Sequence, residues 1–214
     1  MNTCARKNKF SMQWMTGTAM MIALIMVLAN TPLGLIRLPF LTATTLHIPV
    51  IIATLVLGLE AGLITGFVFG LNSLISNLTG ASFFAPFFIN PLVSVLPRML
   101  FPVCVHLIRK AIERIVGHYD CHRSVAYIGA SALGTLAHTA MVMGMIYILY
   151  HARIADMVAA GANAPEVLAQ RGVGIGVALL GMINGVPEAI VATVIAPFIS
   201  KALDGVLDEM NARR

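Results

Sequence analysis

The stretch GVGIGVALLGMINGVPEAIVATVIAPFI, residues 172–199, decides the fold class of this chain. Its 28 residues include a single ionisable side chain, Glu188. A continuous apolar run of this length is typical of a transmembrane helix, because about 20 apolar residues cross the ~30 Å hydrocarbon core of a bilayer. Pro187 and Pro197 are compatible with this interpretation, since membrane helices tolerate proline. We therefore expect residues 172–199 to span a membrane.

The composition of the whole chain fits several such spans. Of its 214 residues, 58% are hydrophobic and 11% are charged, whereas soluble domains carry about 25% charged residues. The sequence thus predicts an all-α integral membrane protein, a bundle of six transmembrane helices forming one membrane domain over residues 1–214. The expected spans are about 12–28, 48–59, 61–78, 90–108, 124–150 and 172–199, with tails at 1–11 and 200–214.

The second of these runs is short for a span. Its length gives a helix of about 18 Å, at 1.5 Å per residue, against a core of ~30 Å. Residues 48–59 therefore either continue into the apolar connection at 29–46 or are sheltered by protein, and His47 could cap the start of this helix. We expect residues 152–171 to form a surface loop that can include a short helix.

The distribution of basic residues predicts the orientation. With six spans and the N-terminus inside, Arg37, Arg153 and Arg171 fall outside and Arg98 lies within a span. The other ten basic residues fall inside: Arg6, Lys7, Lys9, Arg109, Lys110, Arg114, Arg123, Lys201, Arg213 and Arg214. This asymmetry follows the positive-inside rule, so we expect both termini in the cytoplasm. No basic surface remains for a nucleic-acid partner.

Two ionisable residues lie inside expected spans, Arg98 and Glu188. Charge within a bilayer costs several kcal/mol unless it is paired or hydrated, and it commonly marks function. From the expected span ends, Arg98 lies ~12 Å and Glu188 ~24 Å below the outer surface, which argues against a direct pair. Arg98 either faces a ligand or locks helices together. Glu188 contacts a ligand, bonds freed backbone, or meets a partner subunit.

Four amides and one histidine are further polar groups of interest at the expected spans. They are Asn72, Asn77, Asn90, His138 and Asn184. Taken singly, each amide is explained by a hydrogen bond between helices, worth about 0.6 kcal/mol. Polar groups that converge from several helices would instead suit a hydrophilic small molecule. For the set, we favour a substrate-binding pocket.

Small residues mark one face of the first expected span. Ala19 and Ala23 are four residues apart and therefore share a helical face. Small residues at this spacing allow another helix to approach closely.

Motifs for catalysis, nucleotide hydrolysis and metal binding are absent from the sequence. It contains neither a Walker A sequence nor HExxH, and no GxSxG nucleophile. Cys4, Cys104 and Cys121 have no CxxC spacing. We therefore expect no enzyme activity, no cofactor and no metal site.

Three stretches together resemble the substrate-binding S components of energy-coupling-factor (ECF) vitamin transporters. They are TLHIPVI at 45–51, followed by Gly58, Gly62 and Gly66; NPLVSVLPR at 90–98; and NGVPEAI at 184–190. They occur in the family's order, and the resemblance covers most of the chain. After GTL at 134–136 the family often continues with Thr-Asn, whereas Ala137 and His138 follow here, which leaves a ligand contact at His138 open.

This resemblance implies a six-helix protein of a prokaryotic plasma membrane that binds a water-soluble vitamin near the outer surface. Such components are not enzymes, and they dock on a transmembrane coupling subunit driven by two cytoplasmic ATPases. By resemblance, Ala19 and Ala23 would meet the coupling subunit, the connection at 29–46 would act as a lid, and the whole component would topple in the bilayer to deliver its ligand.

The pantothenate-binding and generic S components are the most similar types. Pantothenate is an anion, and Arg98 would complement its carboxylate. Riboflavin or another micronutrient stays open. The main alternative from the sequence is a small oligomeric secondary transporter of a hydrophilic solute, in which Glu188 would carry protons. A purely structural membrane protein would leave the amides as packing groups.

Overall fold

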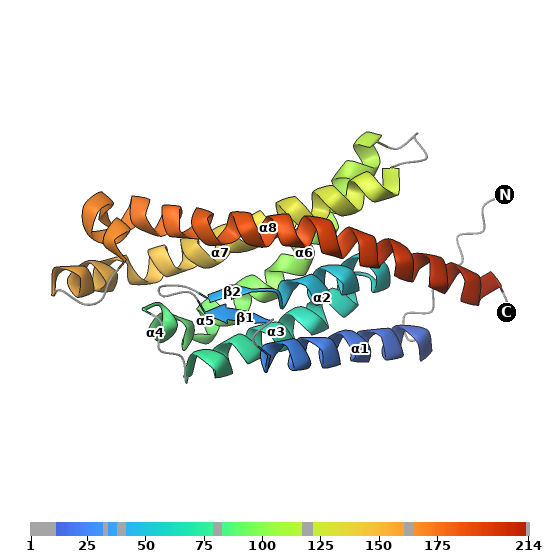
Figure 1. Cartoon of the computed structure of the whole chain (residues 1–214), viewed down its shortest axis with the longest axis horizontal. Coiled ribbons are helices and arrows are strands. Elements are labelled where there is room, and N and C mark those ends of the chain that lie inside the picture. Colours follow the sequence, from blue (N-terminus) through green and yellow to red (C-terminus); the bar gives the residue numbers. More distant parts are fainter. Residues whose placement is uncertain are drawn as a thin grey trace.

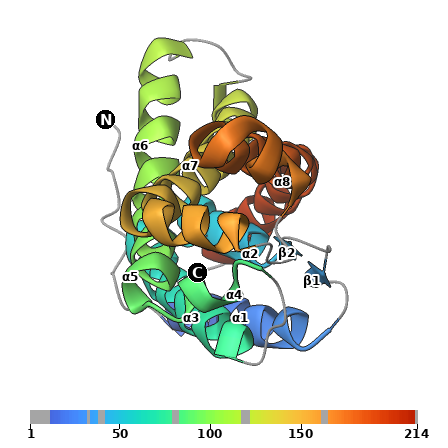
Figure 2. The ribbon, with the colours of Figure 1, turned by 90° about the vertical axis from the view of Figure 1, so that its left-hand side faces the viewer.

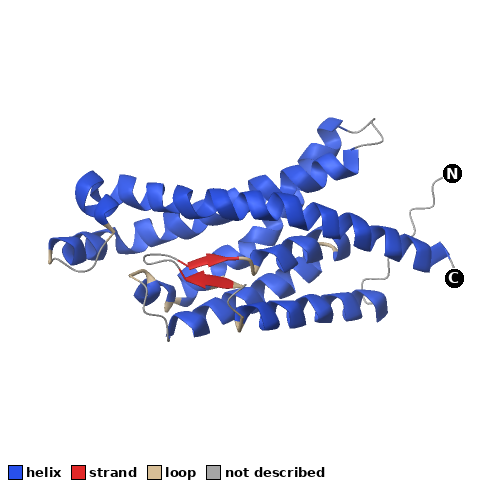
Figure 3. Cartoon of the chain, viewed as in Figure 1, coloured by secondary structure: helices blue, strands red, loops and turns tan. Residues whose placement is uncertain are grey.

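Helices make up most of the structure, a computed structural model that describes residues 12–31, 34–37, 42–78, 83–116, 122–160 and 165–212. The long helices are α1 (Met12–Ala29), α3 (Leu59–Leu78), α6 (Leu96–Val116), α7 (His122–Ala159) and α8 (Glu166–Ala212). Shorter elements connect them: β1 (Leu35–Arg37), β2 (Thr42–Thr44), α2 (His47–Ile52), the π-helix η1 (Ala53–Leu57), α4 (Ala85–Phe88) and α5 (Pro91–Ser94). Figure 3 shows one small hairpin within an otherwise helical bundle.

The long helices run roughly along one axis of the molecule (Figure 1). α7 and α8 lie on one side, and α1 and α3 on the other. Between them lies α2, which packs against α1, α3, α6 and α8 (Figures 1 and 2). α1 begins and α8 ends at the same end of the bundle (Figure 1). The expected tail at 1–11 and the last two residues lie outside the described residues.

Five of the described helices are long and apolar enough to cross a membrane. These are Met12–Ala29, Leu59–Leu78, Pro91–Val116, Arg123–Ala159 and Glu166–Glu209. Large apolar side chains point outward from them, and Phe198, for example, is 78% exposed. Such a surface suits lipid, since it would be costly in water. The all-α membrane fold is confirmed, and the count of six spans stays a prediction.

The second expected span corresponds to a short apolar helix, His47–Leu57, which comprises α2 and η1. Every residue from His47 to Val56 is buried, so this helix is sheltered by protein. Its last carbonyl groups have side-chain donors: Trp14 Nε1 donates to Leu57 O at 3.2 Å and Arg109 Nη1 to Leu55 O at 2.6 Å. Gly58, with φ at 101°, then turns the chain into α3.

The connections differ from their expected forms in two places. The apolar connection at 29–46 contains an antiparallel hairpin in which Leu35 pairs with Thr44. The expected loop at 152–171 is wrong in most of its length, because α7 continues to Ala159 and α8 starts at Glu166. Ile154 of α7 and Leu168 of α8 are buried in the same apolar cluster. This packing stabilises both segments as helices. Gly172, with φ at 77°, kinks α8 soon after its start.

A glycine face on α3 brings the backbone of α6 close. A Cβ on Gly66 would lie 2.5 Å from the carbonyl oxygen of Arg98, and one on Gly62 would lie 3.0 Å from Pro102 Cβ. Pro102 has no N–H and cannot donate to the Arg98 carbonyl as a helix normally requires. The freed carbonyl is therefore accommodated against Gly66, and this contact fixes where α6 carries Arg98.

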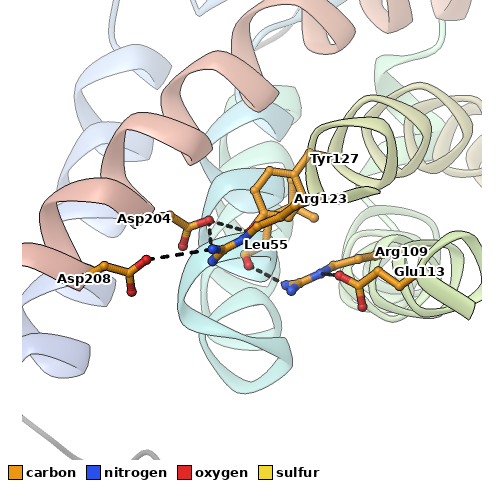
Figure 4. Close-up of polar contacts among 7 residues, drawn as sticks. All are labelled: Leu55, Arg109, Glu113, Arg123, Tyr127, Asp204 and Asp208. Atoms are coloured by element: carbon orange, nitrogen blue, oxygen red, sulfur yellow. Dashed lines mark hydrogen bonds and ion pairs between the residues drawn. The ribbon is translucent and has the colours of Figure 1, made fainter. Parts of the chain in front are cut away.

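A polar network ties α6, α7 and α8 to η1 (Figure 4). Arg123 on α7 pairs with Asp204 on α8 at 2.9 Å. The Tyr127 hydroxyl donates to the same carboxylate at 2.5 Å, and Arg109 lies over the Tyr127 ring at 5.2 Å. The expected tail after residue 200 is thus helical and anchored to α7 through Asp204.

Candidate functional site

Arg98 is the centre of the site. It is the third residue of α6 and only 6% exposed. Its Nη1 donates to the carbonyl oxygens of Ser94 at 2.8 Å and Val93 at 3.4 Å. The guanidinium lies over the rings of Phe69 at 5.0 Å and Phe88 at 5.4 Å. These rings belong to the two separate apolar cores of the bundle, so Arg98 lies where the cores meet.

The charge of Arg98 has no carboxylate partner in the described part of the chain. Its Nε is buried without a hydrogen-bond acceptor. Glu188 attracts it electrostatically, but no ion pair joins these two described residues. A buried cation without a direct counter-ion is costly. The arrangement therefore favours an anionic group as the missing partner.

Glu188 binds backbone instead. Its Oε1 accepts a hydrogen bond of 2.6 Å from the backbone N–H of Thr44, the last residue of β2. This contact joins α8 to the hairpin across most of the sequence. Glu188 thus binds backbone, but the N–H of the hairpin rather than backbone freed by Pro187, and its contact with a ligand stays a prediction. We call this contact the hairpin clasp.

Two histidines lie near one phenylalanine, Phe101, which follows Arg98 by three residues on α6. The ring centroids of His138 and Phe101 are 5.0 Å apart, and those of His47 and Phe101 are 6.4 Å apart. His138 also packs on Phe69 at 6.0 Å. His138 is within electrostatic reach of both Arg98 and His47. Arg98, His47 and His138, which are buried, and Glu188, which is half-buried, together form what we call the buried polar cluster.

The histidines of this cluster have unused polar atoms. His47 is 1% exposed and His138 5% exposed. Nδ1 and Nε2 of His47 and Nε2 of His138 are buried and make no hydrogen bond of standard geometry, although the His47 imidazole lies within reach of the backbone at Thr44 and Glu188. Most buried polar atoms in folded proteins are hydrogen-bonded. Arg98 Nε and His138 Nε2 are thus buried without a partner in one region, with the weakly bonded His47 nitrogens nearby, which is a pattern that a polar ligand would complete.

Asn184 and Asn72 are near this region. Asn184 precedes Glu188 by four residues on α8, so both share one helical face, and Asn184 is buried. Asn72 follows Phe69 by three residues on α3, and its Nδ2 is buried without a partner. Both amides keep the binding role expected for them as a prediction.

Asn77 and Asn90 make local bonds instead. Asn77 Nδ2 donates to Ser73 O of its own helix at 2.7 Å. Asn90 caps α5 by accepting from Leu92 N at 3.0 Å and donates to the Tyr150 hydroxyl at 2.9 Å. The structure does not bring these two residues into the buried polar cluster.

Ala19 and Ala23 are both exposed on α1. The opposite face of α1 packs inward through Thr18, Met21 and Ile25. The two alanines therefore belong to the outward face, where another helix has access.

From the sequence, His47 was predicted only to cap a helix, and the structure shows no side-chain cap there. The signal that would have found it is the short second span: a helix too short to cross the bilayer is sheltered, and a polar side chain on it is then buried. No group of three or more His, Cys, Asp or Glu able to hold a metal is found among the residues that the structure describes.

Comparison with known proteins identifies the family. No curated protein matches the chain. A family model described as "ECF transporter, substrate-specific component" matches residues 13–200, which include every element from α1 to most of α8. This range also contains the whole buried polar cluster. The chain therefore belongs to the substrate-specific components of ECF transporters, multi-pass membrane subunits that bind a substrate and work with coupling subunits and ATPases.

Proposed function

We propose that this chain binds a water-soluble vitamin at the buried polar cluster and that pantothenate is the favoured ligand. The observation that carries the proposal is Arg98, a buried cation held between Phe69 and Phe88 with no carboxylate partner among the described residues. A carboxylate could accept from its Nε in a charge-assisted bond. Riboflavin and other micronutrients are the alternatives that a binding screen would separate.

The proposed orientation places the cluster toward the outer face. α5, which directly precedes α6 and Arg98, lies at the end opposite the start of α1 and the end of α8 (Figure 1). The positive-inside rule assigns the termini to the cytoplasm of a prokaryotic cell. The single domain at 1–214 would then cross the plasma membrane six times. Five crossings are the long helices, and α2 with η1, second in chain order, would be the remaining, sheltered one.

Delivery of the ligand follows from docking on the coupling subunit, which two cytoplasmic ATPases drive. Ala19 and Ala23 are proposed as the docking face, because they are exposed on one side of α1 and are small enough for close approach of a helix. The apolar outer surface suits movement of the whole bundle in lipid.

Secondary transport has less support than it had from the sequence. That alternative required Glu188 as a proton carrier, but its carboxylate accepts the backbone N–H of Thr44 in the hairpin clasp. The family match also assigns the chain to a different class of transporter subunit.

The test is binding by the purified chain alone. Thermal stabilisation and calorimetry with each B vitamin should show tight binding of pantothenate. Arg98→Gln should weaken it about 10- to 100-fold, which corresponds to a lost hydrogen bond to a charged group. Arg153→Gln, at an exposed position, serves as the matched control. Equal pantothenate affinity in Arg98→Gln and wild type would refute the role of Arg98, and no binding of any vitamin would refute the function.

A further inference from the structure

The two histidines of the buried polar cluster offer hydrogen-bonding groups that a ligand carboxylate bound to Arg98 would not occupy. His47 lies at the first turn of α2 and His138 in the middle of α7, far apart in the sequence. They flank Phe101, at ring-centroid distances of 6.4 Å and 5.0 Å. The Phe101 ring is thus a neighbour of both imidazoles, and Nε2 of His138 remains buried without a hydrogen-bond partner.

We propose that His47 and His138 form a hydroxyl-binding subsite beside Arg98, so that the ligand is a carboxylate that also carries hydroxyl groups. This inference rests on the proposed function and names two residues that set its specificity. A neutral imidazole has one donor and one acceptor, and a hydroxyl group likewise donates and accepts. The partnerless Nε2 of His138 and the His47 nitrogens, which make no hydrogen bond of standard geometry, therefore match hydroxyl groups better than they match a second anion or an apolar group.

The position of His47 also relates this subsite to the hairpin. Only Thr45 and Leu46 separate it from Thr44, whose N–H is held by Glu188. The hairpin clasp therefore fixes the start of α2 and, with it, the imidazole of His47. A ligand bound to His47 would lie next to the segment that the hairpin clasp holds in place.

The experiment uses the full chain and three probes: pantothenate, pantothenol, which has an alcohol in place of the carboxylate, and the hydroxyl-free acyl-β-alanine analogue of pantothenate. His47→Leu and His138→Leu should each lower pantothenate affinity about tenfold, as the loss of one neutral hydrogen bond predicts. Neither should change the affinity for the hydroxyl-free analogue. Arg98→Gln should instead remove the preference for pantothenate over pantothenol.

A control separates ligand binding from folding. His106→Leu removes another histidine from α6, eight residues after Arg98, whose Nδ1 is also buried without a partner; it should leave every affinity unchanged. The ligand-free melting temperature of His138→Leu should equal or exceed that of wild type, because an unsatisfied buried polar atom, Nε2, is removed. His47→Gln provides a second variant if His47→Leu does not fold.

Each outcome decides between the two proposals. Unchanged pantothenate affinity in the histidine variants would overturn the subsite while leaving the vitamin-binding function intact. An equal loss for pantothenate and its hydroxyl-free analogue would also overturn it. If wild type binds a vitamin that lacks either a carboxylate or hydroxyl groups in place of pantothenate, both the choice of pantothenate and the subsite are wrong. If wild type binds no vitamin, both proposals fail.

Discussion

Replacing Gly66 by alanine tests whether the approach of α3 to α6 positions the site. The added Cβ would lie 2.5 Å from Arg98 O and 3.1 Å from Pro102 Cγ. Because the first contact is with backbone, no side-chain rotation relieves it, and α6 has to move away by roughly 0.5–1 Å to restore van der Waals distance. Overpacking of this kind costs about 1–3 kcal/mol.

The expected result is a lower melting temperature and weaker vitamin binding. For a chain of this size, 1 kcal/mol corresponds to about 2–4 °C, so Gly66→Ala should lower the melting temperature by about 2–12 °C. The shift of α6 also moves Arg98, and its hydrogen bonds to a ligand should weaken with distance. Circular dichroism during heating in detergent measures the first effect, and calorimetry with pantothenate measures the second.

Gly144→Ala is the matched control. A Cβ on Gly144 meets no atom within 4 Å, and alanine is the better helix former by about 1 kcal/mol or less. Its melting temperature should therefore stay equal or rise slightly, with unchanged affinity. If Gly66→Ala behaves like Gly144→Ala, the close approach does not fix Arg98 and our account of this helix pair is wrong.

Two further predictions concern the hairpin clasp and the docking face. Glu188→Gln keeps an acceptor for Thr44 N–H but removes the charge, so hydrogen exchange at the Thr44 amide should rise about fivefold, for a loss of about 1 kcal/mol. The control Glu113→Gln should not change the exchange rate of this amide. Unaltered exchange in Glu188→Gln would exclude the hairpin clasp. Ala19→Trp should bind vitamin normally but fail to co-purify with the coupling subunit, whereas Met20→Trp should still assemble; assembly of Ala19→Trp would place docking elsewhere.

The helical framework was predictable because a bilayer allows few backbone structures to cross it. Backbone polar groups in hydrocarbon must bond within the chain, so long apolar runs become helices. Arg98 was predictable for the same reason, since an arginine within an apolar run is conspicuous. The extension of α7 and α8 beyond the apolar runs was not, because it depends on tertiary packing of Ile154 and Leu168.

The partners of the polar residues were not predictable from residue type. Asn90 and Asn184 looked alike in the sequence, yet Asn90 caps α5 and binds Tyr150, while Asn184 is buried beside Glu188 on α8. The bond between Glu188 and Thr44 joins residues 144 positions apart, and its donor is a backbone group that leaves no signature in the sequence. Only the fold places these atoms together.

If the substrate binds at the buried polar cluster as proposed, its binding is linked to the stability of the fold. Arg98 Nε and His138 Nε2 have no hydrogen-bond partner between the two apolar cores, and a buried polar group left without a partner costs about 1–3 kcal/mol. A ligand that supplies the missing partners completes the interior, so part of its affinity is the relief of this cost. Because ligand stabilises only the folded form, at a thousandfold excess over its dissociation constant it adds about 4 kcal/mol to the free energy of unfolding. The arrangement therefore favours tight binding by the subunit alone, with release requiring a change in the packing around α2 and α6.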